Sequence, residues 1–136
     1  KIIYQGSTDA KVSNKIISKI KNSDVVIVGP SNPLLSIGPI LSLEKIKNEL
    51  IRHKNVIVIS PFINNKAIKG PSEKNFIDLG YQPSIDGIKK YYNKIGKKYY
   101  VQFGDSDMSD NVSEENIFFR NKNDAVKLAK KILINE

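Results

Sequence analysis

The stretch Val25-Val-Ile-Val-Gly-Pro-Ser-Asn-Pro-Leu-Leu-Ser-Ile-Gly-Pro-Ile-Leu41 decides the fold of this chain. Its beginning, Asp24 to Val28, is a run of β-branched residues typical of a strand buried on both faces of a parallel sheet. Gly29-Pro30 ends the strand, because proline lacks the N–H that a sheet needs. Further prolines among small and hydroxyl-bearing residues predict a stiff loop from Pro30 to Ile40. Open α/β sheets bind ligands at the carboxyl ends of their strands, so we expect this loop to form part of a site.

Strand and helix patterns alternate along the rest of the chain. The expected strands are residues 1–5, 24–28, 55–60, 98–103 and 116–120. The expected helices begin at Ser13, Ser42, Ser72, Pro83-Ser84 and Asp124. All of them except the helix at Ser72 have an apolar stripe, and in chain order the stripes are Ile16, Ile17, Ile20; Leu43, Ile46, Leu50, Ile51; Ile85, Ile88, Tyr92, Ile95; and Val126, Leu128, Ala129, Ile132, Leu133. Residues 104–115 are polar and acidic, which predicts a mobile loop. This order predicts one α/β domain over residues 1–136, a Rossmann-like three-layer α/β/α fold with a mostly parallel sheet of about five strands.

The composition narrows the class of protein. Of the 136 residues, 40% are apolar and 26% charged, as in ordinary soluble proteins. No apolar run reaches the roughly 18 residues that span a bilayer, and the N-terminus lacks a signal-peptide layout. Cysteine is absent, which excludes disulfides and thiolate chemistry. We therefore expect a cytoplasmic protein that does not enter a membrane. The single histidine, His53, ends a helical pattern, where a cation complements the helix dipole.

The formal net charge of +8 comes from 20 lysines and 2 arginines against 14 acidic residues. Such an excess attracts phosphorylated ligands or nucleic acid. The lysines are spread over nearly every expected helix, however, and arginine, which reads bases through bidentate contacts, is scarce. An AT-rich coding sequence accounts for so many Lys, Ile and Asn residues. We expect no nucleic-acid partner and regard an anionic ligand as compatible with the charge.

Several loops should meet at one edge of a parallel sheet, namely residues 6–9, 30–40, 61–71 and 104–107. Ser31, Asn32 and Ser36 offer hydroxyl and amide donors on a stiff backbone. Lys69-Gly70-Pro71 places a cation and a backbone free of side chains before a helix, which favours a phosphate. Ordinary capped turns explain the same residues, and neither a Walker A loop nor G-x-G-x-x-G is present. Asp105 and Asp107 could hold Mg²⁺ or be solvated surface carboxylates.

The segment from Gly29 to Leu41 resembles the signature of the 2-phospho-L-lactate transferase family, which completes the core of the deazaflavin coenzyme F-420. The resemblance extends to Ser60-Pro61, Lys69-Gly-Pro71 and Gly80 to Ser84, and to the helix ending near Tyr92. A related family of nucleotide-sugar-binding gluconeogenesis factors has Gly-Ser-Leu where this chain has Ser31-Asn32-Pro33. The alternative function is accordingly a non-catalytic, nucleotide-sugar-binding regulatory protein. A basic RNA-binding module is a third hypothesis, from a different class.

The resemblance implies transfer of a 2-phospholactate or phosphoenolpyruvyl group from a guanosine-diphospho donor to the deazaflavin Fo, with release of GMP and normally with Mg²⁺. It implies that Ser31, Asn32, Pro33 and Ser36 bind substrate, and that Lys69, Gly70 and Pro71 contact phosphate. No catalytic residue or metal ligand is assigned, and the oligomeric state, a homodimer included, stays open.

The resemblance covers nearly the whole chain but only the C-terminal portion of the family. The Gly-rich nucleotide loop and the family's metal-binding and deazaflavin-binding charged residues have no counterpart in residues 1–136. We therefore expect residues 1–136 alone to show no transferase activity. We also expect them to bind a guanosine nucleotide more weakly than about a millimolar.

Overall fold

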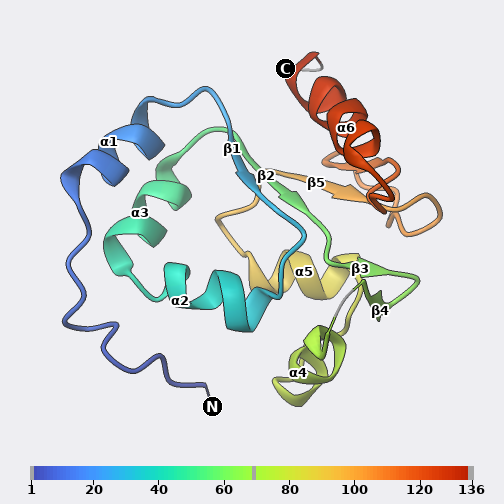
Figure 1. Ribbon diagram of the computed structural model, residues 1–136. Helices are drawn as coiled ribbons and strands as arrows, with labels where there is room; N and C mark the ends of the chain where they lie inside the picture. Colours follow the sequence, from blue (N-terminus) through green and yellow to red (C-terminus); the bar gives the residue numbers. More distant parts are fainter. Residues whose placement is uncertain (1, 69, 135–136) are drawn as a thin grey trace.

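A four-stranded parallel sheet forms the centre of the computed structural model, which describes residues 2–68 and 70–134 (Figure 1). Its strands lie in the order β1-β2-β5-β6 and are Val26–Val28, Val56–Ile59, Lys98–Val101 and Val112–Glu114. All neighbours run parallel; Ile27 aligns with Ile57, and Val58 with Tyr99. The fold class expected from the alternation of strands and helices is confirmed, with four strands in this sheet.

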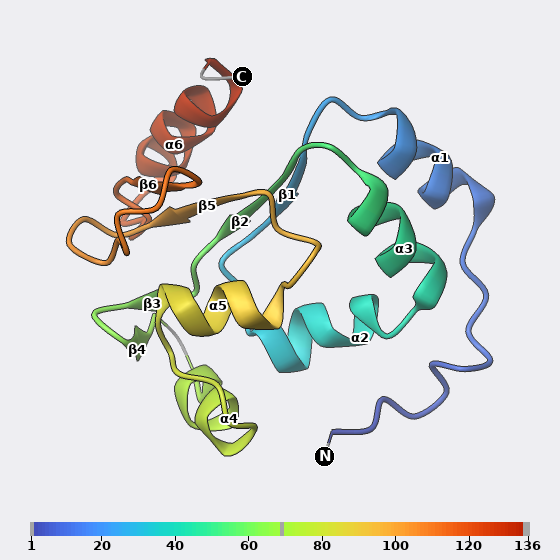
Figure 2. The same cartoon turned by 180° about the vertical axis from the view of Figure 1, so that it is seen from behind.

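The side chains of β2 explain the three layers. Val56 and Val58 face one core, whereas Ile57 and Ile59 face a second core on the other side of the sheet. On the first side pack α1 (Asn14–Asn22), α3 (Glu44–Arg52) and α5 (Ile85–Tyr91). On the second side α6 (Lys122–Ile134) contributes Leu128 and Ile132. Figure 2 shows α6 separated by the sheet from α1 and α3.

The segment after β1 is helical rather than the loop that we expected. A π-helix, η1 (Pro33–Ile37), leads directly into the short helix α2 (Gly38–Leu41). Pro33 is the first residue of η1 and Pro39 the second residue of α2, positions where a helix does not use the N–H that proline lacks. Asn32 caps η1 with its side-chain oxygen, which accepts hydrogen bonds from the amides of Leu34 and Leu35 at 3.0 Å each. The prediction of a loop was wrong for residues 33–41 because it took the prolines as residues that prevent a helix.

Ser42 does not cap α3, contrary to expectation. Its hydroxyl donates to the carbonyl of Pro39 at 2.7 Å and so closes α2, while Leu43 precedes α3 without a side-chain cap. The apolar stripe of α3 is confirmed, since Ile46 and Leu50 are buried.

The remaining expected helices are confirmed. Ser13 caps α1 and Ser84 caps α5, and α4 (Ser72–Asp78) ends before Gly80, whose φ is +83°. Some residues of the expected stripes are exposed because α1 and α6 lie at the periphery and each turns a single narrow face to the core. These residues are Ile16, Val126, Ala129 and Leu133.

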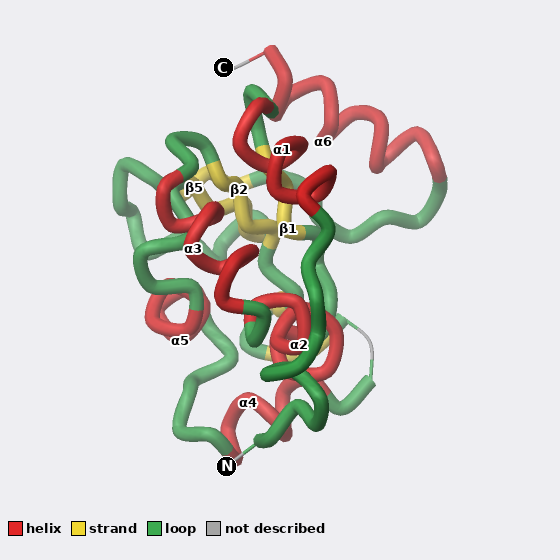
Figure 3. The backbone as a smooth tube through the Cα atoms, turned by 90° about the vertical axis from the view of Figure 1, so that its left-hand side faces the viewer, coloured by secondary structure: helices red, strands yellow, loops and turns green. Residues whose placement is uncertain are grey.

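The first and last expected strands are wrong. Residues 2–12 contain no strand and run as a loop before α1 (Figure 3). Residues 6–9 therefore follow no strand, and Ser7 to Asp9 line a separate cavity beside residues 42–45. The fourth strand is β6, inside the expected mobile loop, and not 116–120. Backbone pairing decides this, because the amides of Tyr99 and Glu115 donate to Asn111 and Val101 at 2.8 and 2.9 Å.

Two further features depart from the expectations. Residues 61–71 contain a hairpin of β3 (Phe62–Ile63) and β4 (Lys66–Ala67), turned by Asn64 and Asn65 at φ of 50° and 61°. β1 is not buried on both faces, because it is an edge strand that α6 does not cover, and Ile27 is 43% exposed. Within the described ranges, no helix has the length and apolar character needed to cross a membrane.

Candidate functional site

A cavity of about 580 Å³ lies at the carboxyl edge of the sheet, where segments that follow β1, β2 and β6 meet. Its size is in the usual range for small-molecule sites, roughly 300–1,000 Å³. The lining residues are Pro30, Ser31, Asn32, Leu35 and Ser36; Pro61, Ile68, Gly70, Pro71 and Ser72; and Ile117, Phe118 and Phe119. The topology thus brings together two loops that the sequence singled out separately.

Five of the seven predicted binding residues line this cavity: Ser31, Asn32, Ser36, Gly70 and Pro71. Pro33 does not line it; the residue is buried in the first turn of η1. Lys69 lies outside the described residues. The binding roles of these residues remain predictions.

Asn32 has only part of its hydrogen-bonding capacity left for a ligand. Its side-chain oxygen is used by the two η1 amides, so the NH₂ group is what Asn32 can offer to the cavity. Ser31 and Ser36 on either side are exposed and add two hydroxyls. This wall of the cavity is therefore polar, neutral and rich in donors.

The part of the cavity lining that follows β6 is apolar and was missed by sequence reasoning. Phe118 and Phe119 follow β6 and are 45% and 38% exposed. Leu35 adds an apolar side chain to the η1 wall and is 57% exposed. The adjacent phenylalanines were assigned to a strand. The side chains of neighbouring residues on an extended chain point to opposite sides, so two consecutive phenylalanines cannot both be buried against the same layer. That pattern in the sequence could have indicated an exposed aromatic side chain here.

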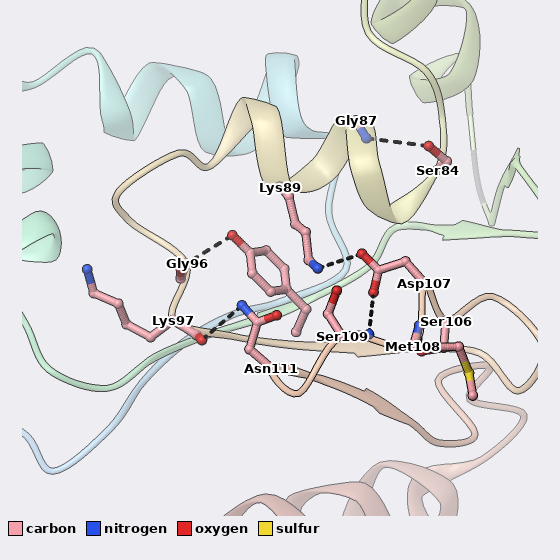
Figure 4. A network of polar contacts seen from close by, with 11 residues as sticks. Ser84, Gly87, Lys89, Gly96, Lys97, Ser106, Asp107, Met108, Ser109 and Asn111 are labelled. Carbon is pink, nitrogen blue, oxygen red and sulfur yellow. Dashed lines mark hydrogen bonds and ion pairs between the residues drawn. The ribbon is translucent and has the colours of Figure 1, made fainter.

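The carboxylates that were considered for Mg²⁺ have other partners. Asp105 accepts the amide of Asn64 at 3.0 and 3.2 Å. Asp107 pairs with Lys89 at 2.6 Å and accepts the amide of Ser109 at 3.1 Å (Figure 4). Partial burial acts to raise the pKa of Asp107, but the bonds from Lys89 and Ser109 outweigh it and lower that pKa. Among residues 2–68 and 70–134, no group of three acidic, histidine or cysteine side chains could hold a metal, so we assign no metal ligand there.

His53 has a structural position. Its Nδ1 accepts the amide of Asn55 at 3.0 Å, which leaves Nε2–H to donate to the carbonyl of Ser23 at 2.9 Å. The ring thus joins the end of α3 to the end of α1, away from the cavity.

Helices on both faces of a parallel sheet define a Rossmann-like α/β fold, and the ligand-sized cavity lies at the edge where such folds bind their ligands. Residues 1–117 match the protein family described as 2-phospho-L-lactate transferase CofD. The chain belongs to this family of transferases.

Relatives with the name 2-phospho-L-lactate transferase are similar over almost the whole chain. The protein of Methanocaldococcus jannaschii is 41% identical over 136 residues, which cover 97% of this chain and 43% of the relative. That of Methanopyrus kandleri is 33% identical over 136 residues, covering 96% and 44%. The chain therefore spans less than half the length of these relatives.

Proposed function

We propose that this chain supplies part of the active site of a transferase in coenzyme F-420 biosynthesis. The enzyme would move a 2-phospholactate-type group from a guanosine-diphospho donor to the deazaflavin Fo and release GMP in the cytoplasm. Membership of the transferase family supports the reaction class. The Mg²⁺ implied by the resemblance stays a prediction for the intact protein, and no described residue is assigned to it.

In this reaction a hydroxyl of the acceptor attacks the phosphorus that carries the lactyl group. A new P–O bond forms, the P–O bond to GMP breaks, and the hydroxyl proton leaves. The protein does little covalent chemistry in such phosphoryl transfers, because positioning and charge stabilisation provide most of the rate enhancement. The task we assign to this chain is to bind and orient the acceptor.

The observation that carries the proposal is that one part of the cavity lining is apolar and aromatic, whereas another part offers polar hydrogen-bond donors. Phe118 and Phe119 offer apolar surface for a flat ring system. Ser31, Asn32 and Ser36 offer neutral donors for a hydroxylated chain. A deazaflavin with its ribityl chain has both parts, and this match favours the acceptor as the occupant. Gly70 and the predicted contact Lys69 are then left for the transferred phosphate.

The experiment uses Asn32→Ala and Asn32→Asp in the intact protein that carries this chain. Aspartate keeps a capping oxygen but removes the NH₂ donor and adds a negative charge. Losing a hydrogen bond to a charged or polar substrate group is expected to lower kcat/KM for the deazaflavin by about tenfold or more. Both variants should show this loss, because both lack the donor.

Asn121→Ala is the matched control. Asn121 caps α6 with the same geometry, accepting amides of Asn123 and Asp124 at 2.9 and 3.3 Å, but does not line the cavity. Its loss should lower stability by about 1 kcal/mol without changing kcat/KM. If Asn32→Asp leaves kcat/KM within about twofold of the wild type, the assignment of this cavity to the acceptor is wrong.

A further inference from the structure

We propose that Tyr4 and Tyr91 are positioning residues of this site: their hydroxyls hold η1 as a π-helix and thereby set how Asn32 and Ser36 face the cavity. The claim about the backbone is independent of the reaction. Its consequence for turnover rests on the proposed function.

The two tyrosines reach consecutive carbonyls of η1 from distant parts of the chain. The hydroxyl of Tyr91, on α5, donates to the carbonyl of Pro33 at 2.7 Å. That of Tyr4, in the loop before α1, donates to the carbonyl of Leu34 at 2.6 Å. Neither tyrosine lines the cavity, so both act through the backbone and not on a ligand.

The hydrogen bonding of η1 shows what these contacts accomplish. The carbonyl of Asn32 accepts the amide of Ile37 at 3.2 Å as well as that of Ser36 at 3.0 Å, and the amide of Gly38 donates to Pro33. The bonds from Ile37 and Gly38 each skip one residue more than in an α-helix. Such π-turns are rare and frequently occur at functional sites. The Tyr4 hydroxyl gives the Leu34 carbonyl a partner in this arrangement, and the Tyr91 hydroxyl gives the Pro33 carbonyl a second one, which favours the arrangement over relaxation to an α-helix.

Gly38 provides the room for this contact. A Cβ at this position would lie 1.9 Å from the hydroxyl oxygen of Tyr4 and 3.2 Å from the Pro33 carbonyl. The φ of Gly38 is −53°, an ordinary helical value, so backbone freedom is not the reason for glycine here. The close approach of Tyr4 is the reason.

Tyr91 also connects the η1 wall of the cavity with the lining at residues 70–72. Its ring packs edge-on against Phe76 of α4, with ring centroids 5.5 Å apart. α4 begins at Ser72, directly after the Gly70-Pro71 wall. One side chain therefore fixes η1 through its hydroxyl and the 70–72 wall through its ring. Burial raises the pKa of Tyr91 well above its ordinary value, so the hydroxyl remains a donor at all working pH values.

The test compares Tyr91→Phe, Tyr4→Phe and the double variant with Tyr99→Phe in the intact protein. Tyr99 is the matched control, because its hydroxyl also donates to a backbone carbonyl, that of Gly96 at 3.3 Å, which is not part of η1. Amide hydrogen exchange at Ser36 to Gly38 should accelerate by about tenfold or more in the double variant and remain unchanged in Tyr99→Phe. Unchanged exchange at these amides in the double variant would overturn the proposal.

The kinetic measurement separates positioning from plain stabilisation. We expect KM for the deazaflavin to rise by about fivefold in Tyr91→Phe with kcat changed less, while Tyr99→Phe leaves both constants unchanged. Faster exchange without any change in KM would overturn the positioning role. Wild-type protein that does not turn over deazaflavin would contradict the proposed function instead, and the exchange result would still decide whether the tyrosines hold η1.

Discussion

Two segments leave the sheet at its carboxyl edge, one after β1 and one after β5, and they are held in opposite ways. Residues 29–38, after β1, are fixed by neutral groups, the amide of Asn32 and the hydroxyls of Tyr4 and Tyr91. Residues 102–109, after β5, are fixed by carboxylates. Asp105 accepts the amide of Asn64, Glu114 accepts those of Gly104 and Ser106 at 3.0 and 3.3 Å, and Asp107 pairs with Lys89.

This difference predicts that the two segments respond differently to changes of pH and salt concentration. Neutral hydrogen bonds keep their strength across pH and salt, whereas surface and half-buried carboxylates lose theirs as they are protonated or screened. The cavity wall that we assign to the acceptor belongs to the insensitive segment. Its geometry should therefore hold under conditions that loosen residues 102–109.

The largest effect is expected for Gly38→Ala. The added methyl group overlaps the Tyr4 hydroxyl, and overpacking of this kind costs about 1–3 kcal/mol. The free energy of unfolding, from urea denaturation, should fall by this amount equally at neutral and mildly acidic pH. Adding Tyr4→Ala removes the overlap, so Gly38→Ala should then have little further effect. A full loss in that double variant would show that Gly38 is needed for some other reason.

A smaller and pH-dependent effect is expected for Asp107→Asn. The Lys89 pair and the Ser109 amide lower the pKa of Asp107 below its ordinary 3.8, so this carboxylate stabilises the fold above that pH. The stabilisation is lost as the pH falls through the lowered pKa. Asp107→Asn should cost up to about 1 kcal/mol at neutral pH and nothing at a pH well below the lowered pKa.

The control for that measurement is Asp110→Asn, an exposed residue of the same loop. It should leave the free energy of unfolding unchanged at both pH values. A deficit of Asp107→Asn that persists undiminished in acid would mean that the carboxylate contributes through packing and not through charge.

The smallest effect is expected for Glu115→Gln. Lys131 of α6 approaches the Glu115 carboxylate at 2.6 Å, but the lysine side chain is 53% exposed. Water and salt screen such a pair, so the loss should stay below about 0.5 kcal/mol and vanish in high salt. A loss above 1 kcal/mol would place this pair among the contacts that hold the α6 layer on the sheet.

Local chemistry predicted much of this fold. The β-branched run at 55–60 has side chains buried on both faces, and the caps at Ser13 and Ser84 are satisfied as their residue types predict. Parallel topology sufficed to bring Ser31 and Gly70 to one cavity. These features depend on residues close in sequence or on a single topological rule.

The features that the sequence did not predict depend on contacts between residues far apart in the chain. β6 holds one apolar residue, Val112, and becomes a strand through backbone pairing with β5. The π-helix at 33–37 accepts hydrogen bonds from the hydroxyls of tyrosines 30 and 58 residues away in the sequence. The Phe118-Phe119 wall faces the cavity because α6 buries Ile117 beside it. No pattern within a short window of sequence contains these contacts.

The central claim is that the cavity between residues 30–36, 70–72 and 117–119 binds the deazaflavin acceptor. Amide hydrogen exchange of the intact protein, with and without Fo, tests it most directly. We predict that Fo slows the exchange of the amides at residues 34–38 and 117–119 and changes the exchange at residues 104–109 little. Protection confined to another surface, such as the cavity lined by residues 7–12 and 42–45, would contradict the claim.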